Sequence, residues 1–207
     1  MIFTAKTVRI LLLAVVILTL IKQLMMNQVI LAFANGTLPS ASYQTPSFNY
    51  STGVLPTDKD EIRPYKWKNE EVTLKKYVDT NGKQMLEMDK DIADSSLTDD
   101  QKKRLVTLGK LPHPCCNAPI DTKDCLHAQA AMGLIKYLIT LGWDDTQIKK
   151  EVLLWYKYWW PRHYAIAATY LSAKGTDPTK VSADDWLSEQ LSTVRSEQVM
   201  MQELNKN

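Results

Sequence analysis

The chain has 207 residues, of which 45% are apolar, so it is long enough for one modest domain with a packed core and additional segments. Its formal charge is +2, but residues 1–34 hold three of the 25 basic residues and none of the 23 acidic ones, which leaves the remainder near neutrality with 22 basic and 23 acidic residues. No stripe of Lys and Arg with interleaved aromatic residues is present, which argues against binding of nucleic acid.

The N-terminal segment, residues 1–34, predicts a membrane anchor or a signal peptide. Residues 10–21 form a twelve-residue apolar run, and the apolar character resumes far enough for residues 10–33 to cross a bilayer. A small-x-small triplet, Ala32-Phe33-Ala34, would suit signal cleavage, but we favour an uncleaved anchor. The cations before the apolar run place the N-terminus inside and the body outside the cytoplasm. A cleaved segment would give a secreted protein.

Residues 35–57 contain no charged residue and are rich in Ser, Thr, Pro and Tyr, which predicts an extended linker. Two N-glycosylation sequons lie in this linker, at Asn35-Gly36-Thr37 and Asn49-Tyr50-Ser51. Both fit an exposed segment of an extracytoplasmic glycoprotein.

A small β-hairpin is predicted at residues 71–88. The segments "VTLKKYV" and "KQMLEM" flank Asp79-Thr80-Asn81-Gly82, and Asn-Gly is the strongest short signal for a hairpin turn.

From residue 97 the pattern is helical, and residues 58–207 are predicted to form a mainly α extracytoplasmic domain of about four helices. Thr98 with Gln101 forms a capping box, and Gly109 ends that helix. Three later helical segments are predicted. The first lies near 124–141, with Asp124 as N-cap and Ala131, Leu134, Leu138 and Leu141 on its apolar face. The second runs from Asp144 or Asp145 to Pro161, with a further turn or helix beyond it, and the last covers roughly 183–204, capped by Ser182 with Asp185.

All three cysteines and two of the three histidines lie in residues 111–127, "LPHPCCNAPIDTKDCLH". His113 and Cys115 share one side of an extended, proline-flanked segment. Pro119 and Asp121-Thr122 supply a turn that brings back Cys125 and His127, which fall in a first helical turn where the dipole favours a thiolate.

Sulfur and imidazole donors together suit a thiophilic ion, and we predict Cu or Zn as the bound metal. The predicted ligands are Cys115, Cys125 and His127, with His113 or Cys116 completing the set. His163 is a further ligand candidate, although a histidine there more often only begins a helix.

A structural disulfide is the alternative, because cysteines outside the membrane tend to oxidise. Cys125 would pair with Cys115 or Cys116, leaving one odd thiol, and His113 would be an exposed loop residue. The protein would then be a non-catalytic accessory subunit of a membrane complex. A thiol redox protein is the third reading.

Two features predict a protein partner in addition to the membrane. Lys22, Gln23 and Asn27 group near one face of the anchor, and polar residues in a span usually face protein or water. The run "WYKYWWPRHY", residues 155–164, holds more aromatic residues than one core face needs. We expect Trp155 and Trp159 in the core and the others at a partner or the membrane surface.

No nucleophile elbow, zinc-protease motif, P-loop or dinucleotide fingerprint occurs, so we expect no enzyme activity.

Residues 115–161 resemble a pattern found in uncharacterised exported or membrane-anchored prokaryotic proteins. The resemblance rests on Cys115-Cys116, then Cys125-Leu126-His127-Ala128, then "GLIKYL" at 133–138, and finally Trp155 with "WWP" at 159–161. It implies an exported helical domain with a cysteine/histidine motif. Related sequences carry extra cysteines between the pair and the C-x-H, where this chain has "NAPIDTKD" and fewer soft ligands.

Overall fold

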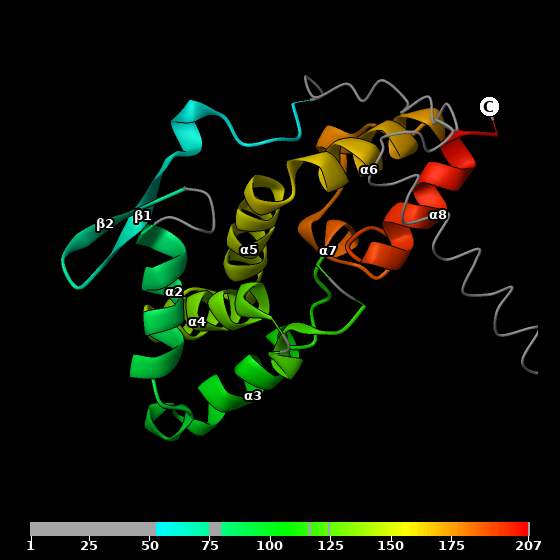
Figure 1. Ribbon diagram of the computed structural model, residues 1–207. Coiled ribbons are helices and arrows are strands. Elements are labelled where there is room, and N and C mark those ends of the chain that lie inside the picture. Colours follow the sequence, from blue (N-terminus) through cyan, green and yellow to red (C-terminus); the bar gives the residue numbers. More distant parts are fainter. Residues whose placement is uncertain (1–52, 75–79, 116, 124, 207) are drawn as a thin grey trace, which may run out of the picture. The chain divides into compact units, whose positions relative to one another are not determined.

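The computed structural model describes residues 53–74, 80–115, 117–123 and 125–206 (Figure 1). These residues contain seven α-helices and one two-stranded antiparallel sheet, so the expectation of a mainly α fold with a small hairpin is confirmed, while the count of about four helices is too low. The strands are β1 (Ile62–Trp67) and β2 (Glu70–Thr73). The helices are α2 (Thr80–Asp91), α3 (Asp99–Leu108), α4 (Leu126–Thr140), α5 (Asp145–Trp159), α6 (Pro161–Ala173), α7 (Ala183–Trp186) and α8 (Val194–Leu204).

The predicted membrane segment and nearly all of the linker, with both sequons, lie outside the described residues. Within the described part of the chain, no helix is both long enough and apolar enough to cross a bilayer.

The hairpin lies earlier in the chain than predicted. Its turn is Lys68-Asn69, and both residues have positive φ, +49° and +69°, as a two-residue type I′ turn requires. The predicted position at 71–88 is wrong because residues from Thr80 onward form α2, with Asn81-Gly82 in its first turn. Met85 and Met88, three residues apart, are both fully buried, so this segment follows helical and not strand periodicity.

The hairpin is held on α5 by a buried network around Glu151. Arg63 donates to both Glu151 oxygens, at 2.7 and 2.5 Å, and the Tyr65 hydroxyl donates to Oε1 at 2.7 Å. The Trp155 indole also donates to Oε1, at 3.1 Å. One buried carboxylate therefore joins β1 to the middle of α5.

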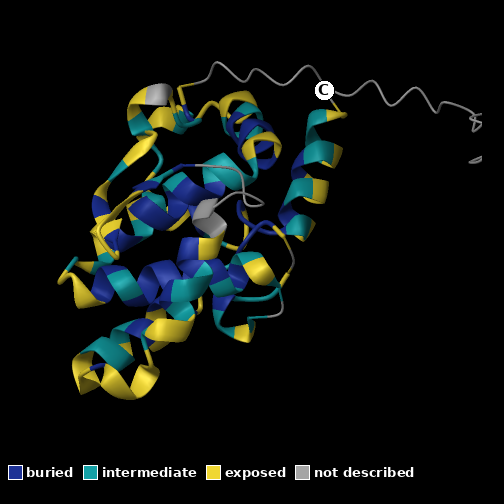
Figure 2. Ribbon diagram, turned by 60° about the vertical axis from the view of Figure 1, so that its left-hand side comes forward, coloured by how far each residue is buried: buried dark blue, intermediate teal, exposed yellow. Residues whose placement is uncertain are grey.

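Helices α2 and α4 cross at Gly133. A Cβ atom on Gly133 would lie only 2.0 Å from the backbone oxygen of Met85, so this contact requires glycine. One turn further, the buried Lys136 ammonium forms ion pairs with Asp89 at 2.8 Å and Asp94 at 2.6 Å. Figure 2 shows the buried positions along the helix faces that pack inward.

The local helix signals are largely confirmed. Thr98 and Gln101 form the capping box of α3, and Gly109 follows its last residue. Asp144 caps α5 with Gln147, and Pro161 is the first residue of α6, where its missing N–H costs nothing. On the predicted apolar face of α4, Ala131, Leu134 and Leu138 are buried, whereas Leu141, after the last helical residue, is exposed.

The single last helix predicted at 183–204 is wrong. Ser182 caps only the short α7, and Thr193 begins α8 with a second capping box. Between the two helices, the Ser192 hydroxyl donates to the Trp186 carbonyl at 2.7 Å, which holds the chain in the break.

Candidate metal centre

The loop from Pro112 to Pro119 carries the first half of the cysteine/histidine motif. Pro112 and Pro119 form an isolated antiparallel bridge, and the Ile120 N–H donates to the Leu111 carbonyl at 3.0 Å. Asn117 ties the loop to α8 by accepting from the Arg195 N–H at 2.9 Å. The predicted turn near Pro119 therefore brings residues 113 and 115 back towards the start of α4.

Cys125 is the N-cap of α4, and its sulfur accepts from the Ala128 N–H at 3.4 Å. Asp124, predicted for this role, lies outside the described residues, and Cys125 takes the position. Lys123, with a left-handed φ of +52°, sets the direction of the chain just before the cap. Its ammonium contacts both Asp89 oxygens at 2.9 Å, and Gln129 donates to its carbonyl at 3.2 Å.

Three of the predicted ligands converge. One ring nitrogen of His113 and the sulfurs of Cys115 and Cys125 all lie within 4.8 Å of one another. Two thiolates that share a Zn²⁺ at about 2.3 Å each are roughly 3.8 Å apart in a tetrahedral site. The limit of 4.8 Å is wider than this spacing, so the donors have to come closer together to share one ion.

The three donors differ in exposure. His113 is fully buried, so its prediction as an exposed loop residue under the disulfide reading is wrong. Cys115 is exposed and Cys125 partly buried, which leaves one side of the cluster open to solvent. The buried imidazole of His113 therefore forms the inner side of the cluster, and Cys115 forms its exposed side.

His127 lies beside this group but its nitrogens are not part of it. Its ring packs against Trp159 and Trp160, with centroids 5.6 and 4.7 Å away. Burial first, and the neighbouring His113 second, lower the pKa of His127 to about 4, so the imidazole is neutral at physiological pH. A neutral imidazole is the form that binds a metal.

Two other predicted positions do not join the group. Cys116 lies outside the described residues. His163 is buried elsewhere, with Nδ1 2.9 Å from a Glu197 carboxylate oxygen and Nε2 2.6 Å from the Leu191 carbonyl oxygen, so it connects α6 to α8 and to the segment before α8.

No disulfide joins the two described cysteines, and Cys125 is a free thiol. The structural disulfide between Cys115 and Cys125 is therefore absent from this structure, while a disulfide that involves Cys116 falls outside the described residues.

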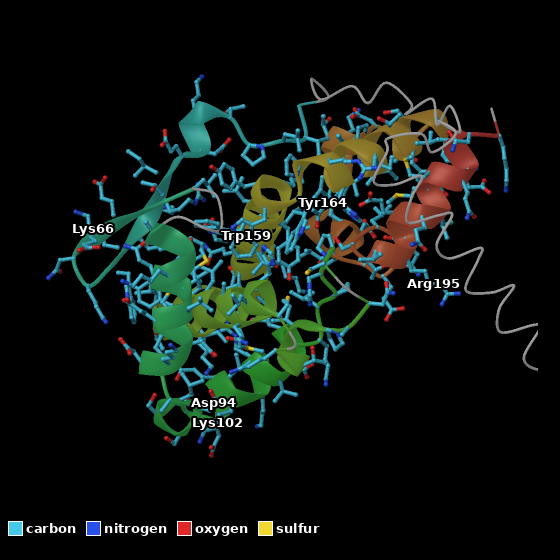
Figure 3. All side chains as sticks on the ribbon, in the orientation of Figure 1. Lys66, Asp94, Lys102, Trp159, Tyr164 and Arg195 are labelled. Carbon is cyan, nitrogen blue, oxygen red and sulfur yellow. The ribbon has the colours of Figure 1, made fainter. Side chains whose placement is uncertain are left out.

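Sequence reasoning missed the role of Trp160. Its indole lies near-parallel to the His113 ring, at 28° with centroids 6.3 Å apart, and also contacts His127. Trp160 comes from the end of α5, and its neighbour Trp159 lies amid the side chains of surrounding elements (Figure 3). The signal in the sequence is Trp160 of the aromatic run, for which the sequence predicts a place at a partner or the membrane surface.

The six Trp and Tyr residues of that run are all buried or partly buried. Trp155, Tyr156 and Tyr164 are fully buried, and the other three pack against the core. Trp155 behaves as predicted, and Trp159 is partly buried. The run therefore belongs mainly to the core and to the wall of the candidate metal centre, and a partner surface here stays a prediction.

No family model matches the chain, and neither a curated protein nor a solved structure is significantly similar to it. The resemblance to exported prokaryotic proteins stays a prediction from the quoted motifs.

Proposed function

We propose that this protein binds one thiophilic metal ion, Cu⁺ or Zn²⁺, through His113, Cys115 and Cys125. The observation that carries the proposal is the convergence of one imidazole and two sulfurs within 4.8 Å, from two segments that a turn and a helix start bring together. Soft thiolates with imidazole nitrogen are the donors that Cu⁺ and Zn²⁺ prefer.

Cu⁺ and Zn²⁺ differ in the number of ligands that they need. Three donors are enough for Cu⁺, whereas Zn²⁺ in a structural site is almost always held by four. His127, beside the group and neutral, and Cys116, adjacent to Cys115 in sequence, are the fourth ligands available to Zn²⁺.

The test uses purified full-length protein, reduced and kept under nitrogen, titrated separately with Cu⁺ and Zn²⁺. We expect one equivalent of metal per chain by native mass spectrometry and elemental analysis, lost in Cys125→Ser and in Cys115→Ser. Retention of binding in both Cys116→Ser and His127→Gln shows that His113, Cys115 and Cys125 are the only protein ligands needed. Weaker binding in one of them identifies that residue as the fourth ligand.

Failure of the reduced wild type to take up either ion would overturn the proposal, as would unchanged binding by Cys125→Ser. A purified protein lighter by two hydrogens, with no metal, would favour the disulfide reading and the accessory-subunit role instead.

We also propose that the site works outside the cytoplasm on a membrane-anchored chain. This rests on the apolar residues 10–33 and the cations that precede them. Carbonate extraction of membranes from cells that express the full-length protein is expected to leave it in the membrane fraction; release into the supernatant would contradict the anchor.

A further inference from the structure

Lys157 on α5 is a partly buried lysine that no carboxylate neutralises. Among the described residues it forms no ion pair or hydrogen bond, and its Nζ lies 4.8 Å from the centroid of the buried Trp186 ring. Burial lowers the pKa of this ammonium group to about 8. A cation held away from water without a counter-charge is costly, so the position calls for an explanation.

Lys157 lines two adjoining hollows, of about 260 and 180 Å³, over α5. Lys150, two helical turns earlier on the same face, lines both hollows as well. Lys150 is also without an ion pair in the described part of the chain, whereas its neighbour Lys149 contacts Asp184. Two uncompensated positive charges therefore face one concave surface.

The hydroxyl groups of the larger hollow already donate to carboxylates, and the one acidic side chain of the lining, Asp60, lies at the smaller hollow only. Asp60 accepts from the N–H and hydroxyl of Thr57, at 2.9 and 3.0 Å. Thr179 donates to Asp177, and Ser182 donates to Asp185. Among the described residues that line the larger hollow, Lys150 and Lys157 are the only charged ones, so the larger hollow is where an anionic group fits.

Apolar side chains form much of the remaining wall. Val54 and Leu153 line both hollows, and Pro178 and Val181 line the larger one. The matching ligand has one negative group for the lysines and a short apolar body for these side chains. Such a ligand supplies the missing counter-charge and excludes water from it.

We propose that the larger hollow, here called the α5 hollow, binds a small organic carboxylate, with Lys157 and Lys150 contacting the carboxyl group and Val54 and Leu153 contacting the apolar body. The site is built from residues other than the metal ligands, and its occupancy does not depend on the metal. The proposal therefore stands or fails independently of the proposed function.

The test measures binding of phenylacetate and butyrate to the full-length protein by isothermal titration calorimetry, with phenylacetamide and butyramide as neutral analogues. We expect saturable binding of at least one carboxylate and no measurable binding of its amide. Lys157→Met keeps the length of the side chain without its charge and should weaken binding about tenfold or more, because a charge-assisted hydrogen bond is lost. Lys150→Met should weaken it by a smaller factor, since Lys150 is exposed.

Lys90→Met is the control, because Lys90 is an exposed lysine of α2 without an ion pair in the described residues. It should bind the carboxylate as the wild type does. A second readout needs no variant: the bound carboxylate should slow acetylation of Lys157 by acetic anhydride, measured by peptide mass spectrometry. Absence of carboxylate binding, equal binding of the amides, unchanged binding by Lys157→Met, or unprotected acetylation of Lys157 would each overturn the proposal.

Discussion

The Glu151 network and the cysteine/histidine loop both bring polar side chains together inside the molecule, but they do so with opposite chemistry. At Glu151, a carboxylate receives donors from Arg63, Tyr65 and Trp155, so each buried group is matched by a complementary one. At the loop, the three converging atoms of His113, Cys115 and Cys125 are all electron-pair donors to metals. A complementary set stabilises the fold, whereas a set of like donors is the arrangement that a cation would complete.

Glu151→Ala removes the carboxylate of the complementary set and should have the largest effect on the free energy of unfolding. The variant leaves the Arg63 guanidinium buried without its carboxylate, and we expect a loss of about 3–5 kcal/mol in the free energy of unfolding. Urea denaturation measures it. Lys206→Ala, which removes an exposed ion pair with Glu203, is the control and should change the value by less than about 1 kcal/mol. Equal effects of the two variants would show that the network contributes little.

Gly133→Ala should cause the next largest loss in the free energy of unfolding. The added Cβ meets the Met85 carbonyl oxygen at 2.0 Å and the Asp89 nitrogen at 2.8 Å, both of which are backbone atoms, so α2 and α4 must separate. We expect a loss of about 3 kcal/mol by urea denaturation. Thr140→Ala, at an exposed position of the same helix, should lie within about 0.5 kcal/mol of the wild type. A neutral Gly133→Ala would contradict the close helix crossing.

Lys157 differs from both the Glu151 network and the cysteine/histidine loop, since it is a partly buried cation without an ion pair among the described residues. Its pKa is about 8 in the folded protein and near 10.5 when unfolded. Between these values the unfolded state holds more protons, so the free energy of unfolding should rise as the pH increases from 8 to 10.5.

Lys157→Met should remove this rise and should stabilise the protein at pH 7 by about 1–2 kcal/mol. Thermal denaturation across this pH range, compared with Lys90→Met, measures both effects. A flat difference between Lys157→Met and the wild type would contradict the lowered pKa.

Cys125→Ser should have the smallest effect on the metal-free fold. Serine is a good N-cap, so its hydroxyl replaces the sulfur as acceptor for the Ala128 N–H, and the free energy of unfolding should change by less than about 1 kcal/mol. Differential scanning calorimetry of the reduced, metal-free proteins measures it. A loss comparable to that of Glu151→Ala would show that Cys125 has a structural role in the metal-free protein.

Most helices of this fold could be predicted because their signals are local. Thr98 with Gln101, Asp144 with Gln147 and Pro161 each act within one turn of their own helix. The hairpin was misplaced because Asn81-Gly82 gave a stronger turn signal than Lys68-Asn69, although the buried methionines of 83–88 already had helical spacing.

The candidate metal centre could be predicted only in part. The turn near Pro119 and the helix start predicted that Cys115 and Cys125 meet, but the prediction made His127 a ligand and His113 only an optional one, whereas the converging atoms belong to His113, Cys115 and Cys125. Trp160 reaches the centre through tertiary packing of α5, and Lys123 is held by Asp89 of α2. Such contacts depend on how helices that are far apart in sequence pack together, and the local spacing of residues does not predict this packing.

X-ray absorption spectroscopy at the metal edge of the loaded full-length protein tests the central claim most directly. We expect two sulfur ligands, at about 2.3 Å for Zn²⁺, with one or two nitrogen ligands of imidazole type. In Cys125→Ser, one sulfur should be lost from the first coordination shell while the fold is retained. A shell of only oxygen and nitrogen atoms, or two sulfur ligands that persist in Cys125→Ser, would contradict a metal centre formed by His113, Cys115 and Cys125.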